Sequence, residues 1–239
     1  MLVPAMNHQE IAAQIRSEHA RICATTLLRL GAEYDRERRK LKIPKDALYP
    51  KEYEIKTAGK NHWIIFLHKA PGDKKYTGTQ SLTFLCVVYY YSNKGLMAYY
   101  VPENNELLAG FTAHFFKRYN ERLGLNLDKP VDIVKAFFRK GMYCTLKMDK
   151  RNNKPHLIAF GVDGIRFAEI MYDFTYVEWR TFVPRQLAFR EQVELEQELA
   201  EELMQEMRES EEGEMFDRLV ARSVRNRVVS IPTAARNIA

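Results

Sequence analysis

The chain has 239 residues, of which 46% are hydrophobic and 12% aromatic, and its formal net charge is +6. This composition excludes global disorder and suits a domain with a substantial core. No apolar run of about 18 residues is present, and the N-terminal residues lack a secretory pattern, so no membrane association is expected. Because Cys23, Cys86 and Cys144 are few and widely spaced, we expect reduced thiols and a cytoplasmic location.

Residues 7–42 are predicted to form a long N-terminal helix, because apolar residues recur at a helical period and the first interrupting proline is Pro44. The segment ends in a basic run. Its candidate nucleic-acid-binding side chains are Arg36, Arg38, Arg39 and Lys40. Contacts to phosphates are the functional interpretation of this run, and a solvated helix face is the alternative.

A strand-rich core is predicted over residues 51–184. Alternating or β-branched and aromatic stretches indicate strands at 51–57, 61–69, 81–92 and 96–101, and further strands between residues 142 and 183. Asp163-Gly164 is typical of a two-residue hairpin turn. Two central helices, at about residues 111–122 and 131–139, separate the two groups of strands.

These elements predict one α+β domain over residues 1–189, with a curved antiparallel sheet of about seven strands packed against the N-terminal helix and the two central helices. Residues 190–239 are predicted to form a long acidic helix and a basic, partly disordered tail. Between Glu191 and Asp217 there are twelve acidic residues and one basic residue.

The charge is therefore distributed unevenly. Subtracting the 7 basic and 12 acidic residues of 190–239 from the totals of 37 and 31 leaves 30 basic and 19 acidic residues in 1–189, a net charge of about +11. A basic body favours a polyanionic partner such as RNA, and a lysine-rich soluble surface is the alternative. The acidic segment 190–208 is a candidate contact for a homo-oligomer or another partner, or a mimic of a nucleic-acid backbone.

Several common active-site motifs are missing. The sequence contains no glycine-rich nucleotide-binding loop, no His-Glu-x-x-His, no Cys-x-x-Cys and no Gly-x-Ser-x-Gly. The six histidines are scattered without metal-ligand spacing. We therefore expect neither a metal nor a cofactor.

The stretch from Phe111 to Arg122 carries the most distinctive pattern. Its aromatic residues fill one arc of a helix, and His114, Arg118 and Arg122 follow the edge of that arc at i, i+4 and i+8. Cleavage of RNA through a 2′,3′-cyclic phosphate requires an acid, a base and fixed positive charge on the phosphate. An imidazole beside two guanidinium groups supplies this chemistry without a metal.

This helix, followed by strands that close in Trp179-Arg-Thr-Phe-Val183, resembles the metal-independent ribonuclease toxins of the barnase–colicin–RelE superfamily. The resemblance covers residues 107–184 at most. It implies catalytic roles for His114, Arg118, Arg122 and Thr181, and a nucleic-acid contact at Arg180. The strands predicted before the helix depart from the arrangement of that superfamily.

Two functional hypotheses follow. The first is a metal-independent, ribonuclease-like domain that processes nucleic acid, and the second is a non-catalytic nucleic-acid- or protein-binding protein of a mobile element. Each candidate also has a structural interpretation, since His114 can serve packing, the arginines can form surface ion pairs, and Thr181 can be an ordinary strand residue. His156, which follows a proline at a strand start, is assigned no role.

Overall fold

The computed structural model describes residues 1–43, 49–69, 82–101, 108–140, 144–151, 154–171 and 175–189, together with residues 192, 194, 197 and 201. The chain divides into two compact units, Met1–Leu187 and Ala188–Ala239. The predicted acidic helix 190–208 and the basic tail lie outside the described residues, apart from those four helical positions. Among the helices described, none combines the length and the apolar character needed to cross a membrane.

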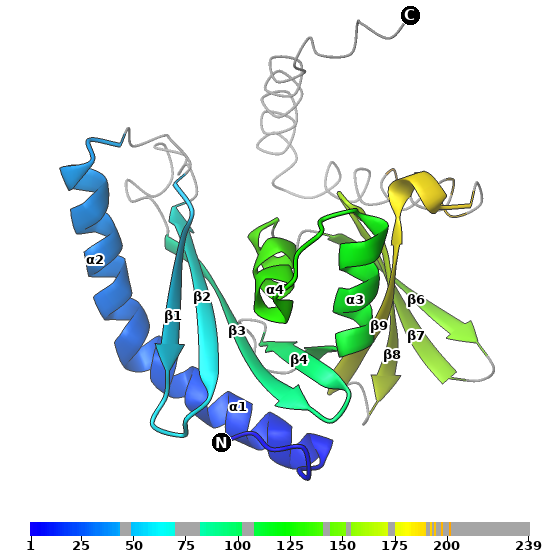
Figure 1. Cartoon of the computed structure of the whole chain (residues 1–239), viewed down its shortest axis with the longest axis horizontal. Coiled ribbons are helices and arrows are strands. Elements are labelled where there is room, and N and C mark those ends of the chain that lie inside the picture. The colour runs from blue at the N-terminus through cyan, green and yellow to red at the C-terminus, as the bar shows by residue number, and fades with distance from the viewer. Residues whose placement is uncertain are drawn as a thin grey trace, which may run out of the picture. The chain divides into compact units, whose positions relative to one another are not determined.

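The first unit contains a nine-stranded sheet in the order β1-β2-β3-β4-β5-β9-β8-β7-β6 (Figure 1). The α+β class is confirmed, and the expected number of about seven strands is corrected to nine. The strands are β1 Lys51–Lys56, β2 His62–Lys69, β3 Leu82–Ser92, β4 Gly95–Tyr100, β5 Leu108–Phe111, β6 Cys144–Arg151, β7 Lys154–Gly161, β8 Gly164–Met171 and β9 Tyr176–Pro184.

Strand β5 joins the two halves of the sheet and was not predicted. It pairs in parallel with β9, whereas the other pairs of neighbouring strands are antiparallel. Its sequence, Leu-Ala-Gly-Phe, has four residues and no alternation of polar and apolar side chains, so periodicity could not separate it from the helix that follows. All four residues are buried, which explains why a strand without a polar face forms here.

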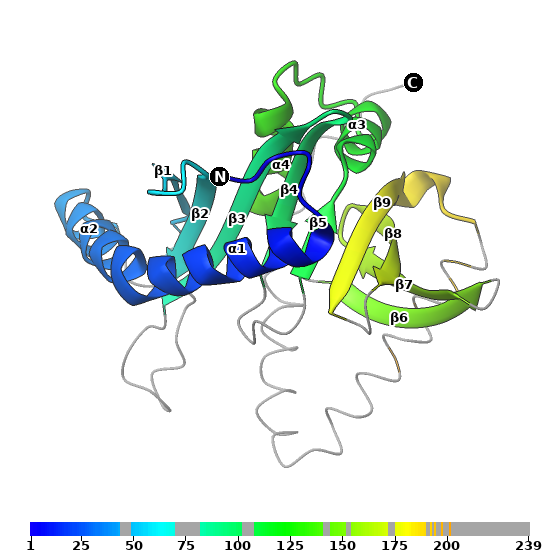
Figure 2. The same ribbon diagram turned by 90° about the horizontal axis from the view of Figure 1, so that it is seen from below.

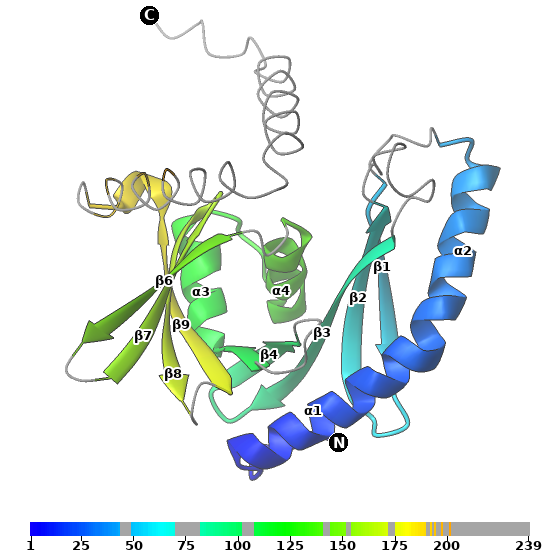
Figure 3. The same ribbon diagram turned by 180° about the vertical axis from the view of Figure 1, so that it is seen from behind.

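The predicted N-terminal helix is present as α1 His8–Arg21, a π-helical turn at Ile22–Thr26, and α2 Leu27–Lys40. A capping box starts α1, because the side chain of Asn7 accepts from the amide of Glu10 and the carboxylate of Glu10 accepts from the amide of Asn7. The helix changes direction near the π-helical turn (Figure 3). An extra residue in such a turn interrupts the regular α-helical hydrogen bonds and so permits a bend.

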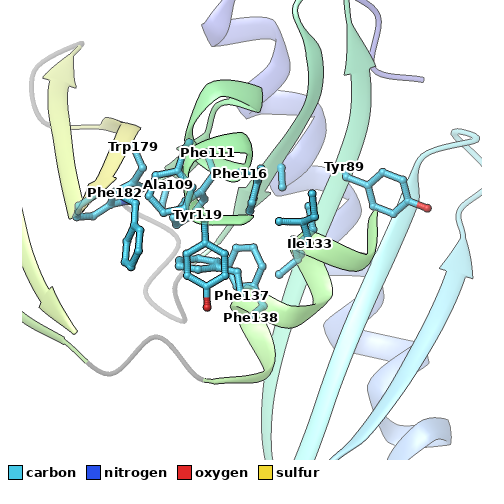
Figure 4. Packing of buried hydrophobic residues seen from close by; sticks show 14 of the residues in the cluster. Tyr89, Ala109, Phe111, Phe116, Tyr119, Ile133, Phe137, Phe138, Trp179 and Phe182 are labelled. Atoms are coloured by element: carbon cyan, nitrogen blue, oxygen red, sulfur yellow. The ribbon is translucent and has the colours of Figure 1, made fainter. Parts of the chain in front are cut away.

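The helices cover the two faces of the sheet in different places (Figure 2). Ile15, Leu30 and Tyr34 of α1 and α2 pack against one face, with Trp63 of β2 at the centre of this contact. On the other face lie α3 Ala113–Arg122 and α4 Pro130–Arg139. The second core is largely aromatic (Figure 4). Its rings include Phe111, Phe115, Tyr119, Phe137, Trp179 and Phe182.

A buried ion pair fastens the turn between β7 and β8 to this aromatic core. Arg166 and Asp163 are 3.3 Å apart, and their side chains are 2% and 5% exposed. The hydroxyl of Tyr119 donates to the second oxygen of Asp163 at 2.8 Å, and the guanidinium of Arg166 lies over the ring of Phe137. Burial, and then the Asp163 carboxylate, raise the pKa of Tyr119, so the phenol stays neutral and its hydroxyl donates a hydrogen bond to Asp163.

Candidate functional site

The predicted ridge of cations on α3 lies at the surface. The side chain of His114 is exposed, while Arg118 pairs with Glu121 at 3.4 Å. Arg122 donates to the backbone carbonyl of Phe182 in β9. One of the two predicted phosphate-binding guanidinium groups therefore helps to hold α3 against the sheet.

Thr181 does not lie beside this ridge. Helix α3 packs on the face of β9 that carries Trp179 and Phe182, whereas Thr181 points to the opposite face. The convergence of His114, Arg118, Arg122 and Thr181 in one concavity, which the sequence interpretation required, is not observed. The reason is the β-bulge at Arg180, which turns Thr181 to the face opposite to Trp179, so that the sheet separates Thr181 from the helix.

Thr181 instead lines a hollow of about 350 Å³ on the face of β7, β8 and β9 that lies opposite to α3. We call it the β7–β9 hollow. Its side chains include His156, Ile158, Phe167, Glu169, Arg180 and Thr181. An imidazole, a carboxylate, a guanidinium and a hydroxyl thus share one concavity with an aromatic ring.

A β-bulge brings two neighbouring residues of β9 to this hollow. Phe167 of β8 pairs with Thr181, but the next residue, Ala168, pairs with Trp179, which leaves Arg180 as the extra residue. Without the bulge, alternation would turn Arg180 and Thr181 to opposite faces. Both line the hollow, and bulges of this kind often re-aim side chains at functional sites.

A chain of polar contacts runs across the sheet into the hollow. The hydroxyl of Tyr176 contacts Glu178 at 3.4 Å, Arg180 donates to Glu178 through Nε at 2.8 Å, and Arg180 donates to Glu169 through Nη1 at 2.7 Å. Burial, followed by the charge of Glu178, raises the pKa of Tyr176, so this phenol stays protonated. The two carboxylates fix the direction of the guanidinium at the rim of the hollow.

The polar groups retain unused hydrogen-bonding capacity. Within the described part of the chain, no acceptor faces Nη2 of Arg180, and no donor faces Oε2 of Glu169. His156 lies directly opposite Glu169 in the β7–β8 pairing. The Cβ atoms of such a pair are roughly 4.5–5.5 Å apart, so the imidazole and the carboxylate can reach the same bound molecule.

The predicted basic run on α2 is divided by burial. Arg38 is 6% exposed, packs over the ring of Tyr34 and donates to its hydroxyl at 3.4 Å. It therefore cannot present its guanidinium to a nucleic acid, which corrects the prediction for this residue. Arg36, Arg39 and Lys40 are exposed, and Nε of Arg39 donates to the carbonyl of Asp35 at 3.3 Å.

The sequence interpretation missed His156, Glu169 and Phe167. The predicted turn at Asp163-Gly164 is shifted by one residue, because the turn residues are Val162 and Asp163 and the closing pair is Gly161 and Gly164. Counted from the predicted turn, His156 would face Met171, whereas the observed register places Glu169 there, so the sequence alone did not reveal this pair.

Three or more His, Cys, Asp or Glu side chains grouped to hold a metal ion do not occur within the ranges described. Neither models of known protein families, nor curated protein sequences, nor solved structures match this chain.

Proposed function

We propose that the chain is a metal-independent, ribonuclease-like enzyme whose site is the β7–β9 hollow. The observation that carries the proposal is the presence of His156, Glu169, Arg180 and Thr181 in one concavity beside the ring of Phe167. These are the groups that RNA cleavage needs: an acid, a base, a cation and a hydrogen-bond donor for the phosphate. The half-buried ring of Phe167, which lines the hollow, adds an aromatic surface against which a base can pack.

The reaction is a transesterification. The base, Glu169 or His156, removes the proton of the ribose 2′-hydroxyl, and the 2′-oxygen attacks the adjacent phosphorus. The bond from phosphorus to the 5′-oxygen breaks, and the other member of the pair gives that oxygen a proton. The products are a 2′,3′-cyclic phosphate and a 5′-hydroxyl. Arg180 through Nη2 and Thr181 through its hydroxyl stabilise the charge on the phosphate oxygens.

The charge around the hollow sets a condition on the substrate. Glu169 and Glu178 outnumber Arg180 by one, so these three side chains do not attract a polyanion by themselves. Lys147 lies opposite Ile158 in the β6–β7 pairing and therefore on the same face. It adds a positive charge beside the hollow, and further attraction must come from other parts of the basic body.

Replacement of His156 by alanine is expected to lower the rate of RNA cleavage by roughly 10²–10⁴-fold, because one proton transfer loses its catalyst. The measurement uses a single-stranded RNA oligonucleotide in the presence of a metal chelator, with the products identified by mass spectrometry. Thr181→Val should also slow cleavage, with unchanged thermal unfolding.

His114→Ala is the matched control, since it removes an exposed imidazole that does not line the hollow. It should cleave at the wild-type rate. If His114→Ala loses cleavage and His156→Ala retains it, the hollow is not the active site, and the catalytic residues lie on α3 instead. A substrate with a 2′-deoxy group at the scissile position should remain intact with all variants.

A non-catalytic binding protein is the second candidate. The observation that favours it is the pairing of Arg180 with two carboxylates, which neutralises the cation at the rim of the hollow. Under this alternative, the purified protein binds RNA or another partner but yields no cyclic phosphate under any condition of the assay above.

A further inference from the structure

The outer face of α2 carries a row of cations. Leu27, Leu30 and Tyr34 bury one side of this helix. On the opposite side, Arg29, Arg36 and Lys40 fall within an arc of about 40°, because seven and four residues are close to whole numbers of helical turns. Arg29 and Lys40 lie about 17 Å apart along the axis at 1.5 Å per residue.

These three side chains are exposed, and none of them forms an ion pair with another residue of the described ranges. The one exposed acidic residue near the row on α2 is Glu33. Arg36 and Lys40 lie in the C-terminal half of α2, and Lys40 lies in its last turn, where the helix dipole favours positive charge. Three exposed cations with Glu33 as their acidic neighbour leave this side of the helix with a net positive charge, which fits a polyanion.

Helix α2, which carries the row, lies on the same side of the sheet as the β7–β9 hollow. Helices α1 and α2 cover the face that carries Trp63 and Tyr176, and Glu178 and Arg180 continue that face into the hollow. Helix α2 lies beside β1, where Tyr34 donates to the carbonyl of Tyr49 at 2.6 Å and Glu37 pairs with Lys51. Five steps between neighbouring strands separate β1 from β9, which is about 24 Å.

We infer that the row of Arg29, Arg36 and Lys40 binds the phosphate backbone of a nucleic acid whose other end enters the hollow. This inference rests on the proposed function and names its substrate class: a single-stranded RNA long enough to span both places. At 3.4 Å per nucleotide of a stacked strand, the distance of about 24 Å from β1 to β9 alone corresponds to about seven nucleotides, and the hollow extends beyond β9 to β7. A shorter RNA can enter the hollow without contacting the row. The row therefore increases the affinity for longer RNA, and the hollow carries out the reaction.

The test compares the full-length protein with Arg29→Gln/Arg36→Gln/Lys40→Gln. Binding of a 12-nucleotide 2′-deoxy strand is measured by fluorescence anisotropy between about 50 and 200 mM salt. Loss of three phosphate contacts should lower the slope of log affinity against log salt by about 2, since each contact on a single strand contributes about 0.7. For cleavable RNA, KM for a 12-mer should rise while kcat is unchanged, and cleavage of a dinucleotide should stay at the wild-type rate.

The matched control, Lys94→Gln/Lys117→Gln/Lys129→Gln, removes the same charge from exposed positions on the β3–β4 turn, on α3 and before α4. An equal loss of affinity in this control would overturn the inference, because binding would then depend on net charge alone. An unchanged salt slope in the α2 variant would overturn it as well. If polyglutamate displaces the 2′-deoxy strand as strongly as RNA does, the row binds an acidic protein instead, and the inference is overturned.

Failure of the row and failure of the proposed function are separable. Binding of the 2′-deoxy strand tests the row even where no cleavage occurs. If the row does not bind nucleic acid but the hollow is the cleavage site, the α2 variant binds and cleaves every substrate like the wild type, while His156→Ala still loses cleavage.

Discussion

Replacement of Asp163 by alanine should lower the free energy of unfolding by about 3–5 kcal/mol, because it leaves the buried guanidinium of Arg166 without the carboxylate that faces it. The hydroxyl of Tyr119 loses its acceptor in the same variant. Natural domains have a total stability of about 5–15 kcal/mol, so this single change threatens the fold. Urea unfolding followed by the fluorescence of Trp63 and Trp179 measures the effect.

Glu121→Ala is the matched control. Its carboxylate pairs with Lys117 at 3.8 Å and Arg118 at 3.4 Å, and all three side chains are at least 43% exposed. Exposed pairs contribute about 1 kcal/mol or less. Asp163→Ala/Arg166→Met should recover part of the lost stability, since the double variant removes the buried guanidinium together with the carboxylate that faces it. A loss below about 1 kcal/mol for Asp163→Ala would show that the pair does not hold the β7–β8 turn to the core.

Replacement of Glu18 by alanine is the second change with a large expected effect. The buried carboxylate accepts from the indole of Trp63 at 2.9 Å, the amide of Asn61 at 2.8 Å and the hydroxyl of Thr57 at 2.9 Å. Each buried donor left without an acceptor costs about 1–3 kcal/mol. We expect a loss of about 3 kcal/mol or more, measured by thermal and urea unfolding.

The position of Glu18 explains why the effect should extend beyond one contact. Its partners lie on the β1–β2 hairpin, so the carboxylate joins α1 to the sheet, and Asn61 in turn accepts from the amide of Leu2 at 2.6 Å. Hydrogen exchange should therefore accelerate in α1 and in β1–β2 together. Glu33→Ala, at an exposed position on α2, should change stability by less than about 0.5 kcal/mol. Equal behaviour of the two variants would contradict the assigned role of Glu18.

Local patterns in the sequence were sufficient for elements whose side chains alternate or repeat over many residues. The helix at residues 7–42 and the strand at 81–92 follow from such patterns, and the structure has α1–α2 and β3 there. The four-residue β5 could not be predicted, because its pairing with β9 depends on a contact between residues about 68 positions apart. Long-range pairing of this kind leaves no local periodicity.

The candidate site was less accessible to prediction than the fold. The helical spacing of His114, Arg118 and Arg122 follows from the sequence, but the face of β9 that carries Thr181 does not. That face is set by the bulge at Arg180, and no single residue type marks a bulge of this kind. The predicted turn at Asp163-Gly164 would not have paired His156 with Glu169, because the turn lies one residue earlier in the chain. Their approach to Arg180 also required the β8–β9 register.

The central claim is that nucleic acid enters the β7–β9 hollow. Nuclear magnetic resonance of the imidazole groups tests it most directly, because the chain has six histidines and His156 and His114 can each be assigned from an alanine variant. A 2′-deoxy dinucleotide, which cannot be cleaved, is titrated into the full-length protein. We predict a saturable change in the signal of His156 and none in that of His114. A response of His114 with an unchanged signal of His156 would contradict the account.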